Sequence, residues 1–207
     1  MYASKIWAWV LTAVVGYLLG SITVSVCLSV GMGRDVRKEG SGNAGATNMA
    51  RVFGMKAGLI TLLGDMVKAA LAVLLGYLLL DDMGLMAGGI ACIVGHCFPV
   101  FHQFKGGKGV SVGGLLSLMI DWRVGLLVFG SFGLFAVASK KVSLGSICGA
   151  VAITVGSIIF HVSTPRLILA IVAMCMVIIQ HRGNIKRLIN GTEPDFRPKS
   201  TRKTENA

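Results

Sequence analysis

The sequence predicts an all-α fold, a polytopic bundle of membrane-spanning helices, and three observations lead to it. Of the 207 residues, 54% are hydrophobic and only 14% are charged, whereas about a quarter of the residues in soluble domains are charged. The hydrophobic residues gather in runs that approach the roughly 20 residues needed to cross a bilayer. The charged residues fall almost entirely between these runs. We therefore expect one transmembrane domain over residues 1–190, followed by a polar, basic and mobile cytoplasmic tail over 191–207.

Six apolar runs are long enough, or nearly long enough, to cross the membrane, and a seventh is short. The seventh, 110–120, is expected to be a thin, tilted or re-entrant helix. Pro99 ends the third run, because proline has no N–H to continue a helix. About seven crossings follow, with five or six as alternatives. The six longer runs are 6–30, 57–80, 84–101, 123–139, 143–160 and 166–180.

The orientation of the bundle follows from the lysine and arginine residues between the runs. Alternate gaps, together with the chain after residue 180, hold 16 of the 20 basic residues, and the gaps on the other side hold three. Loops rich in lysine and arginine stay in the cytoplasm. The N-terminus is therefore expected outside and the C-terminus in the cytoplasm.

Three polar, glycine-rich segments interrupt the apolar runs, and all three fall on the expected cytoplasmic side. We call 40–51 the first polar segment, 104–109 the second and 181–185 the third. Glycine lets backbone N–H groups turn toward an anion, and arginine adds a planar fork that suits phosphate. A site for phosphate at the membrane edge is therefore expected. Its candidate side chains are Ser41, Asn43, Thr47, Asn48, Arg51, Lys105 and Lys108, beside Gly42, Gly106 and Gly107.

Other residues add to this site or to the bundle around it. His181 and Asn184 lie three residues apart, so that they share one face of the last helix, and histidine exchanges protons near neutral pH. Ser143 begins a helix just after Lys140-Lys141. Asp65 and Lys68 lie inside the second run, where a structural ion pair is expected.

Several familiar functions are excluded. Residues 40–45 match G-x-G-x-x-G, but a membrane helix precedes them where a dinucleotide site needs a strand. The Gly107-Lys108 pair lacks the upstream glycine and the following Ser or Thr of a nucleotide-binding P-loop. The four histidines have no zinc spacing, and aromatic residues do not alternate with the basic ones as in nucleic-acid-binding proteins. We expect no metal, no cofactor and no nucleic-acid partner.

The three polar segments and their surroundings resemble the bacterial acyl-phosphate-dependent glycerol-3-phosphate acyltransferases, an integral membrane family. The chain differs from the family pattern at Ala69, Ser111-Val112 and Lys141. The likeness is carried by Tyr17-Leu18-Leu19-Gly20-Ser21-Ile22, Ser41-Gly42-Asn43, Gly45-Ala46-Thr47-Asn48, Arg51, Gly95-His96, Phe98-Pro99-Val100-Phe101, residues 104–110, His181-Arg182, Asn184-Ile185, Arg187-Leu188, Gly191 and Glu193.

The resemblance implies transfer of a fatty acyl group from acyl phosphate to the 1-hydroxyl of glycerol 3-phosphate, in the cytoplasmic (inner) membrane of a bacterium. The implied partners are both substrates and membrane lipids, with no obligate protein partner. Lys108, the glycine N–H groups and Ser143 would hold the acyl phosphate. His181 or a substrate phosphate would be the base, and an acyl-enzyme through Ser41 is the less favoured route. The expected catalytic residues are Ser41, Arg51, Lys108, His181 and Asn184.

Two other functions remain open from the sequence. A transporter for a small phosphate-bearing anion would also use broken helices and a basic cavity. Against transport, the chain has no obvious inverted repeat, and its polar segments lie on one face of the membrane. A purely structural scaffold would leave the three polar segments without a purpose.

Overall fold

The computed structural model describes residues 5–197, and within them the chain forms only α-helices and short 3-10 helices. The expected all-α class is thereby confirmed. The helices, in chain order, are α1 (Ile6–Ser21), α2 (Val24–Gly31), η2 (Val36–Lys38), α3 (Ala46–Phe53), α4 (Met55–Cys97), η3 (Val100–His102), α5 (Val110–Ile120), α6 (Trp122–Ser139), α7 (Val142–Ile159), α8 (Thr164–Gln180) and α9 (Arg182–Ile189).

The longest helix, α4, consists of two antiparallel halves. The backbone leaves the helical region at Leu80 and Asp81, where Asp81 has a φ of 53°. A Cβ atom on Gly76 would lie 2.1 Å from the carbonyl oxygen of Gly84, and one on Gly88 would lie 2.4 Å from that of Ala72. Because these residue pairs are placed symmetrically about Leu80, the chain reverses there. The two halves correspond to the second and third apolar runs.

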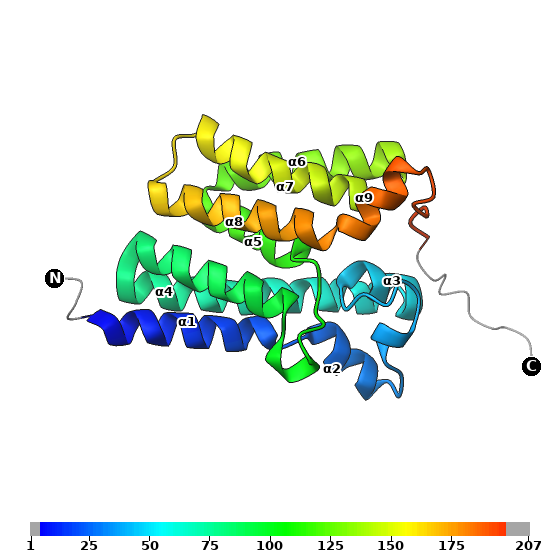
Figure 1. Ribbon diagram of the computed structural model, residues 1–207, viewed down its shortest axis with the longest axis horizontal. Helices are drawn as coiled ribbons and strands as arrows, with labels where there is room; N and C mark the ends of the chain where they lie inside the picture. Colours follow the sequence, from blue (N-terminus) through cyan, green and yellow to red (C-terminus); the bar gives the residue numbers. More distant parts are fainter. Residues whose placement is uncertain (1–4, 198–207) are drawn as a thin grey trace, which may run out of the picture.

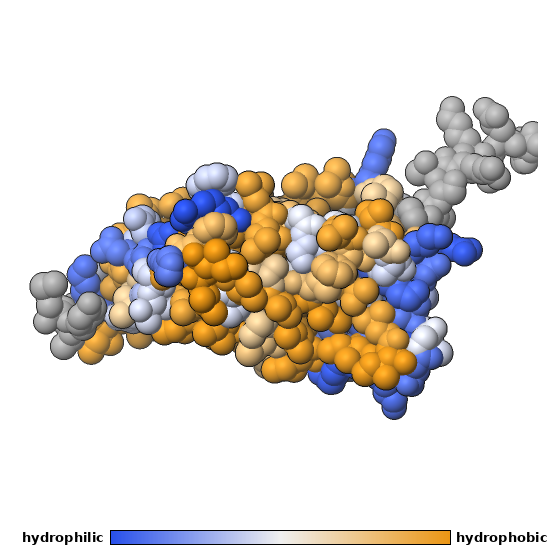
Figure 2. Space-filling model, turned by 90° about the horizontal axis from the view of Figure 1, so that it is seen from above, coloured by the Kyte–Doolittle hydropathy of each residue, from blue (hydrophilic) through white to orange (hydrophobic). Residues whose placement is uncertain are grey.

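The bundle is layered around α4. Helix α1 packs along one side of α4, helices α5 and α8 lie against the other side, and α7 with α6 lie beyond them (Figure 1). The main hydrophobic core fills the space between α4, α5 and α8, with Val73, Leu116 and Leu169 fully buried. Figure 2 shows hydrophobic residues over most of the visible flank and hydrophilic residues gathered toward the two ends. This pattern suits a bundle whose flank faces lipid.

Four helical stretches of the described chain are long and apolar enough to cross a membrane, and α8 with α9, bent by 60°, would be a fifth. Helix α4 counts once in that number although it folds back on itself. Helix α5 has 11 residues and is thus about 16 Å long, roughly half of a hydrocarbon core. Its Val112, Leu116 and Ile120 are buried inside the bundle, so α5 is the short segment that the sequence indicated.

The first apolar run, 6–30, forms one candidate span, but its helix is interrupted. Ile22 and Thr23 are extended and separate α1 from α2. Carbonyl groups freed by the break need new partners in the membrane. The Lys68 ammonium supplies them, since it donates to the carbonyl oxygens of Gly20 (2.9 Å) and Ile22 (2.6 Å).

The chain after α9 packs against the bundle as far as the described residues reach, and the expected domain boundary at residue 190 stays a prediction. The Phe196 N–H donates to the carbonyl oxygen of Lys140, and Lys141 pairs with Asp195 at 2.9 Å. Glu193 is buried. We call residues 191–197 the C-terminal strap. The rest of the expected mobile tail, 198–207, lies outside the described residues.

All three polar segments meet at one end of the bundle. The first includes α3, the second leads into α5, and the third lies at the bend between α8 and α9. In Figure 1 this end of the bundle is the one where α2, α3 and α9 are labelled. The reversal within α4 and the connections between α5 and α6 and between α7 and α8 lie at the opposite end. The alternating directions of the helices therefore bring together segments that are far apart in sequence.

Candidate active site

A cavity of about 640 Å³ opens at the polar end of the bundle and extends between the helices. Side chains from all three polar segments line one part of it, together with Ser143 of α7 and residues of the C-terminal strap. The other part is lined by apolar side chains, among them Leu62, Met66, Val128, Phe129, Phe132 and Ile153. The cavity thus has a polar end and an apolar end, which suits a ligand with a charged head and a hydrocarbon tail.

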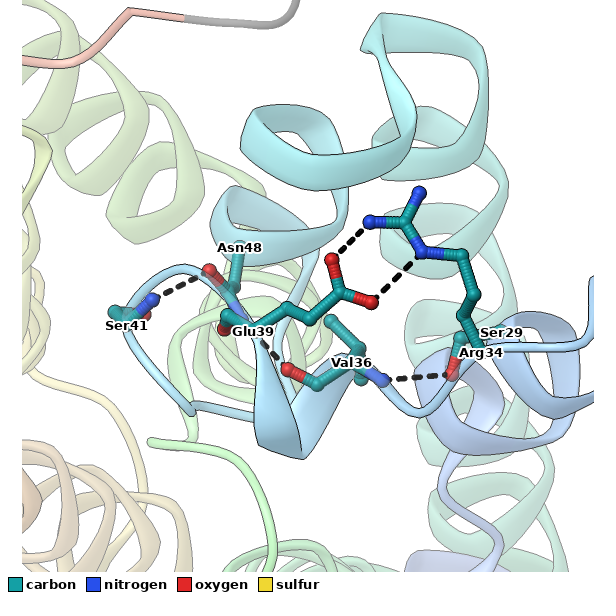
Figure 3. Close-up of polar contacts among 6 residues, drawn as sticks. All are labelled: Ser29, Arg34, Val36, Glu39, Ser41 and Asn48. Atoms are coloured by element: carbon teal, nitrogen blue, oxygen red, sulfur yellow. Dashed lines mark hydrogen bonds and ion pairs between the residues drawn. The ribbon is translucent and has the colours of Figure 1, made fainter.

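Asn48 holds the first polar segment in shape from within (Figure 3). Its Oδ1 accepts from the Ser41 N–H at 2.9 Å, and its Nδ2 donates to the carbonyl oxygens of Val36 and Glu39 at 3.1 and 3.0 Å. A Cβ atom on Gly40, whose φ is +57°, would lie 2.3 Å from Asn48 Oδ1. The Asn48 amide is therefore occupied by its own loop. It positions Ser41, and the direct contact with substrate that we expected of Asn48 stays a prediction.

Two further contacts support this loop. Ser29 Oγ of α2 accepts from the Val36 N–H at 3.2 Å, and the Arg34 guanidinium pairs with the Glu39 carboxylate, as Figure 3 shows. The first links the loop to the end of α2, and the second closes the turn that precedes Gly40. Because glycine-rich chain is flexible, these contacts are what give the loop one conformation.

Four other side chains of the first polar segment line the cavity, namely those of Ser41, Asn43, Thr47 and Arg51. Gly42 lines a smaller, adjoining cavity of about 340 Å³. Among the described residues, the Arg51 guanidinium has neither an ion-pair nor a hydrogen-bond partner. Its charge is thus available to an anion.

Lys108 brings the second polar segment into the cavity. It is partly buried, and its Nζ donates to Asn184 Oδ1 at 2.5 Å. Burial holds the pKa of Lys108 below its ordinary value, and the nearby charge of Arg187 acts in the same direction. An anionic ligand placed between these cations would favour the charged form of Lys108.

The structure does not bring Lys105, Gly106 and Gly107 to the cavity. Lys105 is exposed, and the two glycines pack against the end of α4. A Cβ atom on Gly106 would lie 2.1 Å from the carbonyl oxygen of His96, and one on Gly107 would lie 2.2 Å from His96 Nε2. The glycines are thus required by close packing. The expected contact of these three residues with substrate stays a prediction.

His181 lies at the bend that follows α8 and is the N-cap residue of α9, the helix that contains Asn184. Its Nδ1 is 2.8 Å from the carbonyl oxygen of Val177. A carbonyl only accepts, so Nδ1 carries the ring proton and Nε2 is an acceptor. Burial lowers the pKa of His181 to about 4. The imidazole is therefore neutral at pH 7 and lines the cavity as an acceptor.

Asn184, Arg187 and Glu193 form a chain of hydrogen bonds that leads to Lys108. Asn184 Nδ2 donates to Glu193 Oε1 at 2.6 Å, and Arg187 Nε donates to Glu193 Oε2 at 2.7 Å. Burial alone would raise the pKa of Glu193, but the nearby Ser143 hydroxyl, the Asn184 amide and the Arg187 guanidinium outweigh burial and lower the pKa. The ionised carboxylate fixes the Asn184 amide with its oxygen toward Lys108.

Arg187 and Glu193 were not among the expected site residues, although the family resemblance includes both and both line the cavity. Arg187 lies three residues after Asn184, on the same face of α9, and this spacing was the available signal. Glu193 follows Gly191 in a polar stretch with no periodicity. Only the folded strap shows that it is buried. Ser143, in contrast, lines the cavity from the first turn of α7, as expected.

Neither metal ligands nor disulfides contribute to this arrangement within residues 5–197. No three His, Cys, Asp or Glu side chains there are grouped so that they could hold a metal ion. Cys27, Cys92, Cys97, Cys148 and Cys175 are all unpaired. The polar end of the cavity is therefore built from hydroxyl, amide, imidazole and cationic groups together with one carboxylate.

A bundle of apolar helices around a cavity that is cationic at one end and apolar at the other defines a membrane protein that binds an anionic amphiphile. The comparison with known families is more specific. Residues 10–191 match the model of the family described as glycerol-3-phosphate acyltransferase. The chain belongs to this family. The matched residues include all three polar segments.

Curated relatives and solved structures agree with the family match. The chain is 41% identical over 185 residues to a glycerol-3-phosphate acyltransferase of Thermoanaerobacter pseudethanolicus, which covers 89% of this chain and 93% of that protein. It is 37% identical to the glycerol-3-phosphate acyltransferase of Bacillus subtilis, and the match covers 89% of this chain and 95% of that protein. Among solved structures, the chain matches the crystal structure of PlsY (YgiH), an integral membrane glycerol 3-phosphate acyltransferase, in its glycerol 3-phosphate form. The TM-score is 0.87 at 32% identity, and the match covers 91% of this chain and 96% of the PlsY chain. Its lysophosphatidic acid form matches with a TM-score of 0.86.

Proposed function

We propose that this chain transfers a fatty acyl group from acyl phosphate to the 1-hydroxyl of glycerol 3-phosphate, giving lysophosphatidic acid and inorganic phosphate. The observation that carries the proposal is the meeting of Arg51, Lys108 and Arg187 at the polar end of a cavity that continues into an apolar groove. Both substrates carry a phosphate, and the donor also carries a hydrocarbon tail. One cavity with these two ends accommodates both.

The acceptor would bind among Ser41, Asn43, Thr47 and Arg51. The Arg51 fork matches two phosphate oxygens, and the neutral hydroxyl and amide groups have room to contact the glycerol hydroxyls. The Asn48 amide holds this wall in place. Such pre-organisation lowers the entropy lost when the substrate is oriented for attack.

The acyl phosphate would lie with its tail in the apolar groove and its head against Lys108. The Lys108 ammonium, held by Asn184, would stabilise the charge that grows on the phosphate as the bond between the acyl carbon and the phosphate oxygen breaks. Ser143 would contact the same head group. Phosphate leaves as the glycerol oxygen bonds to the acyl carbon, so a metal ion is not needed to balance the step.

The hydroxyl proton has two candidate acceptors. His181 is neutral and has Nε2 unprotonated, which suits a general base. A phosphate oxygen of either substrate is the alternative, because phosphate is both a base and a good leaving group. A covalent acyl-enzyme through Ser41 is disfavoured, because no base hydrogen-bonds to the Ser41 hydroxyl within the described residues.

Purified protein in detergent tests the reaction. Phosphate release from palmitoyl phosphate should require glycerol 3-phosphate and should equal the lysophosphatidic acid formed. Rapid quenching after mixing with palmitoyl phosphate alone should give no acylated protein. Labelled protein that passes its acyl group to glycerol 3-phosphate would replace direct transfer by an acyl-enzyme, and no phosphate release with both substrates present would refute the proposed donor.

We further propose seven crossings of the bacterial cytoplasmic membrane, with the N-terminus outside, the polar end in the cytoplasm and no obligate protein partner. The basic residues of the polar end support this orientation, and the seven alternating segments, α5 included, support the number. In intact cells, a membrane-impermeant thiol reagent should fail to label a cysteine placed at Lys105 and should label one placed at Trp122. The reverse pattern would invert the topology.

A further inference from the structure

A cluster of charged and polar side chains, Asp65, Lys68 and His96, lies inside α4, outside the three polar segments in sequence. Their exposed fractions are only 1%, 4% and 3%. Ionised groups in the core of a membrane bundle are costly, and well-packed apolar residues would often serve stability equally well. Such a cluster in so apolar a helix indicates a task beyond packing.

The Lys68 ammonium is the centre of this cluster. Besides the carbonyl oxygens at the break between α1 and α2, it contacts Asp65 Oδ1 at 2.9 Å and His96 Nδ1 at 3.1 Å. Asp65 Oδ1 lies 3.6 Å from His96 Nδ1, which is too far for a hydrogen bond. An ammonium only donates, and Lys68 has three protons for these four contacts. We assign one of the protons to His96 Nδ1, which then accepts, so that the ring proton lies on Nε2.

The Nε2 edge of His96 faces the active-site cavity and the second polar segment. His96 lines the cavity, and Gly107 packs so closely on Nε2 that no Cβ atom would fit between them. The Gly107 N–H also donates to the His96 carbonyl oxygen at 3.0 Å. No described residue accepts a hydrogen bond from Nε2. The loop that carries Lys108 therefore rests on an imidazole whose N–H donor is unused.

We propose that Lys68 is a positioning residue, which holds His96 as an Nε2–H donor toward the anionic head of a bound substrate and supports the Lys108 loop through it. Asp65 supplies the counter-charge of Lys68 inside the bundle. The same ammonium fixes the break between α1 and α2, so one side chain joins that break to the wall of the active site. The kinetic part of the test rests on the proposed function, and the spectroscopic part does not.

The kinetic test compares His96→Leu with His96→Gln, whose amide N–H can replace Nε2–H. We expect kcat/KM for palmitoyl phosphate to fall about a hundredfold in His96→Leu, as for the loss of one oriented donor, and to stay near that of the unaltered chain in His96→Gln. Asp65→Asn/Lys68→Met, which leaves no unpaired buried charge, should lose about a hundredfold through misplacement. Thr61→Val is the matched control, because Thr61 is buried in the same helix and bonds only to the Ala57 carbonyl oxygen; its kcat/KM should not change.

The spectroscopic test reads the tautomer of His96 directly. In protein labelled with ¹⁵N-histidine, the His96 resonances are assigned as those that disappear from the spectrum of His96→Gln. They should show a protonated Nε2 and an accepting Nδ1. In the Asp65→Asn/Lys68→Met variant this pattern should be lost. A protonated Nδ1 or an imidazolium in the unaltered chain would overturn the proposal whatever the kinetics. Unchanged kcat/KM in His96→Leu would also overturn it. Failure of the unaltered chain to turn over both substrates would refute the proposed function instead, and the tautomer would still decide the role of Lys68.

Discussion

Replacement of Lys108 by methionine is expected to lower kcat/KM for acyl transfer by about 100- to 1000-fold. Methionine keeps most of the length of the side chain and removes the charge, so the variant isolates electrostatics from packing. The Lys108 ammonium lies at the polar end of the cavity and is oriented by Asn184 at 2.5 Å. The loss of one pre-organised donor at a developing negative charge typically has an effect of about this size. Initial rates at varied palmitoyl phosphate give the value.

The matched control is Lys105→Met, the same substitution three residues earlier in the same loop. Lys105 is exposed and does not line the cavity, so its variant should keep nearly full activity. Equal losses in the two variants would mean that the general positive charge of the loop matters and that the placement of Lys108 does not. Near-normal activity in Lys108→Met would remove Lys108 from the site altogether.

The contrast between Lys105 and Lys108 shows what sequence reasoning could and could not find. The second polar segment is visible because lysine and glycine interrupt apolar runs, and this reading located the site. Which lysine faces the cavity depends on how Gly106 and Gly107 pack against His96. That packing joins the loop to the end of α4 in three dimensions, and no local pattern in the sequence encodes it.

The sequence also did not predict the hydrogen-bond partners of Asn48 or the burial of Glu193. Asn48 has the right chemistry for a substrate ligand, but its amide is used within its own loop. Glu193 lies in a stretch that reads as a mobile tail, but it is buried against α9. Residue type and local pattern predict which groups are polar. They do not predict which polar groups satisfy one another after folding.

The helices were predictable where hydrophobicity alone determines them and not where a distant polar group intervenes. The reversal within α4 falls at the Asp81-Asp82 gap, where the apolar run stops. The break at Ile22 and Thr23 has no such signal, since the run around it is apolar throughout. It is stabilised by Lys68, 46 residues away from Ile22. Family membership then sets aside the transporter and scaffold alternatives that composition left open.

Replacement of Arg51 by alanine is expected to lower kcat/KM for glycerol 3-phosphate by at least about a hundredfold. Lys108 is bound to Asn184 and Arg187 is paired with Glu193, whereas the Arg51 guanidinium has no partner within residues 5–197. It is therefore the cavity cation whose charge a substrate phosphate can neutralise without displacing another group. Charge-assisted hydrogen bonds to phosphate are among the strong ones. Initial rates at varied glycerol 3-phosphate measure the effect.

Arg51→Lys distinguishes a planar fork from a simple charge. If Arg51 binds two phosphate oxygens at once, lysine should recover only a small part of the lost activity, because a single ammonium cannot reproduce the bidentate geometry. Arg123→Ala removes the same charge at the opposite end of the bundle, where Arg123 pairs with Asp121, and should leave kcat/KM unchanged. Full recovery in Arg51→Lys would reduce the role of Arg51 to electrostatic attraction. A loss confined to the palmitoyl phosphate kinetics would move Arg51 to the donor phosphate, and the two phosphates would then have to exchange places in the cavity.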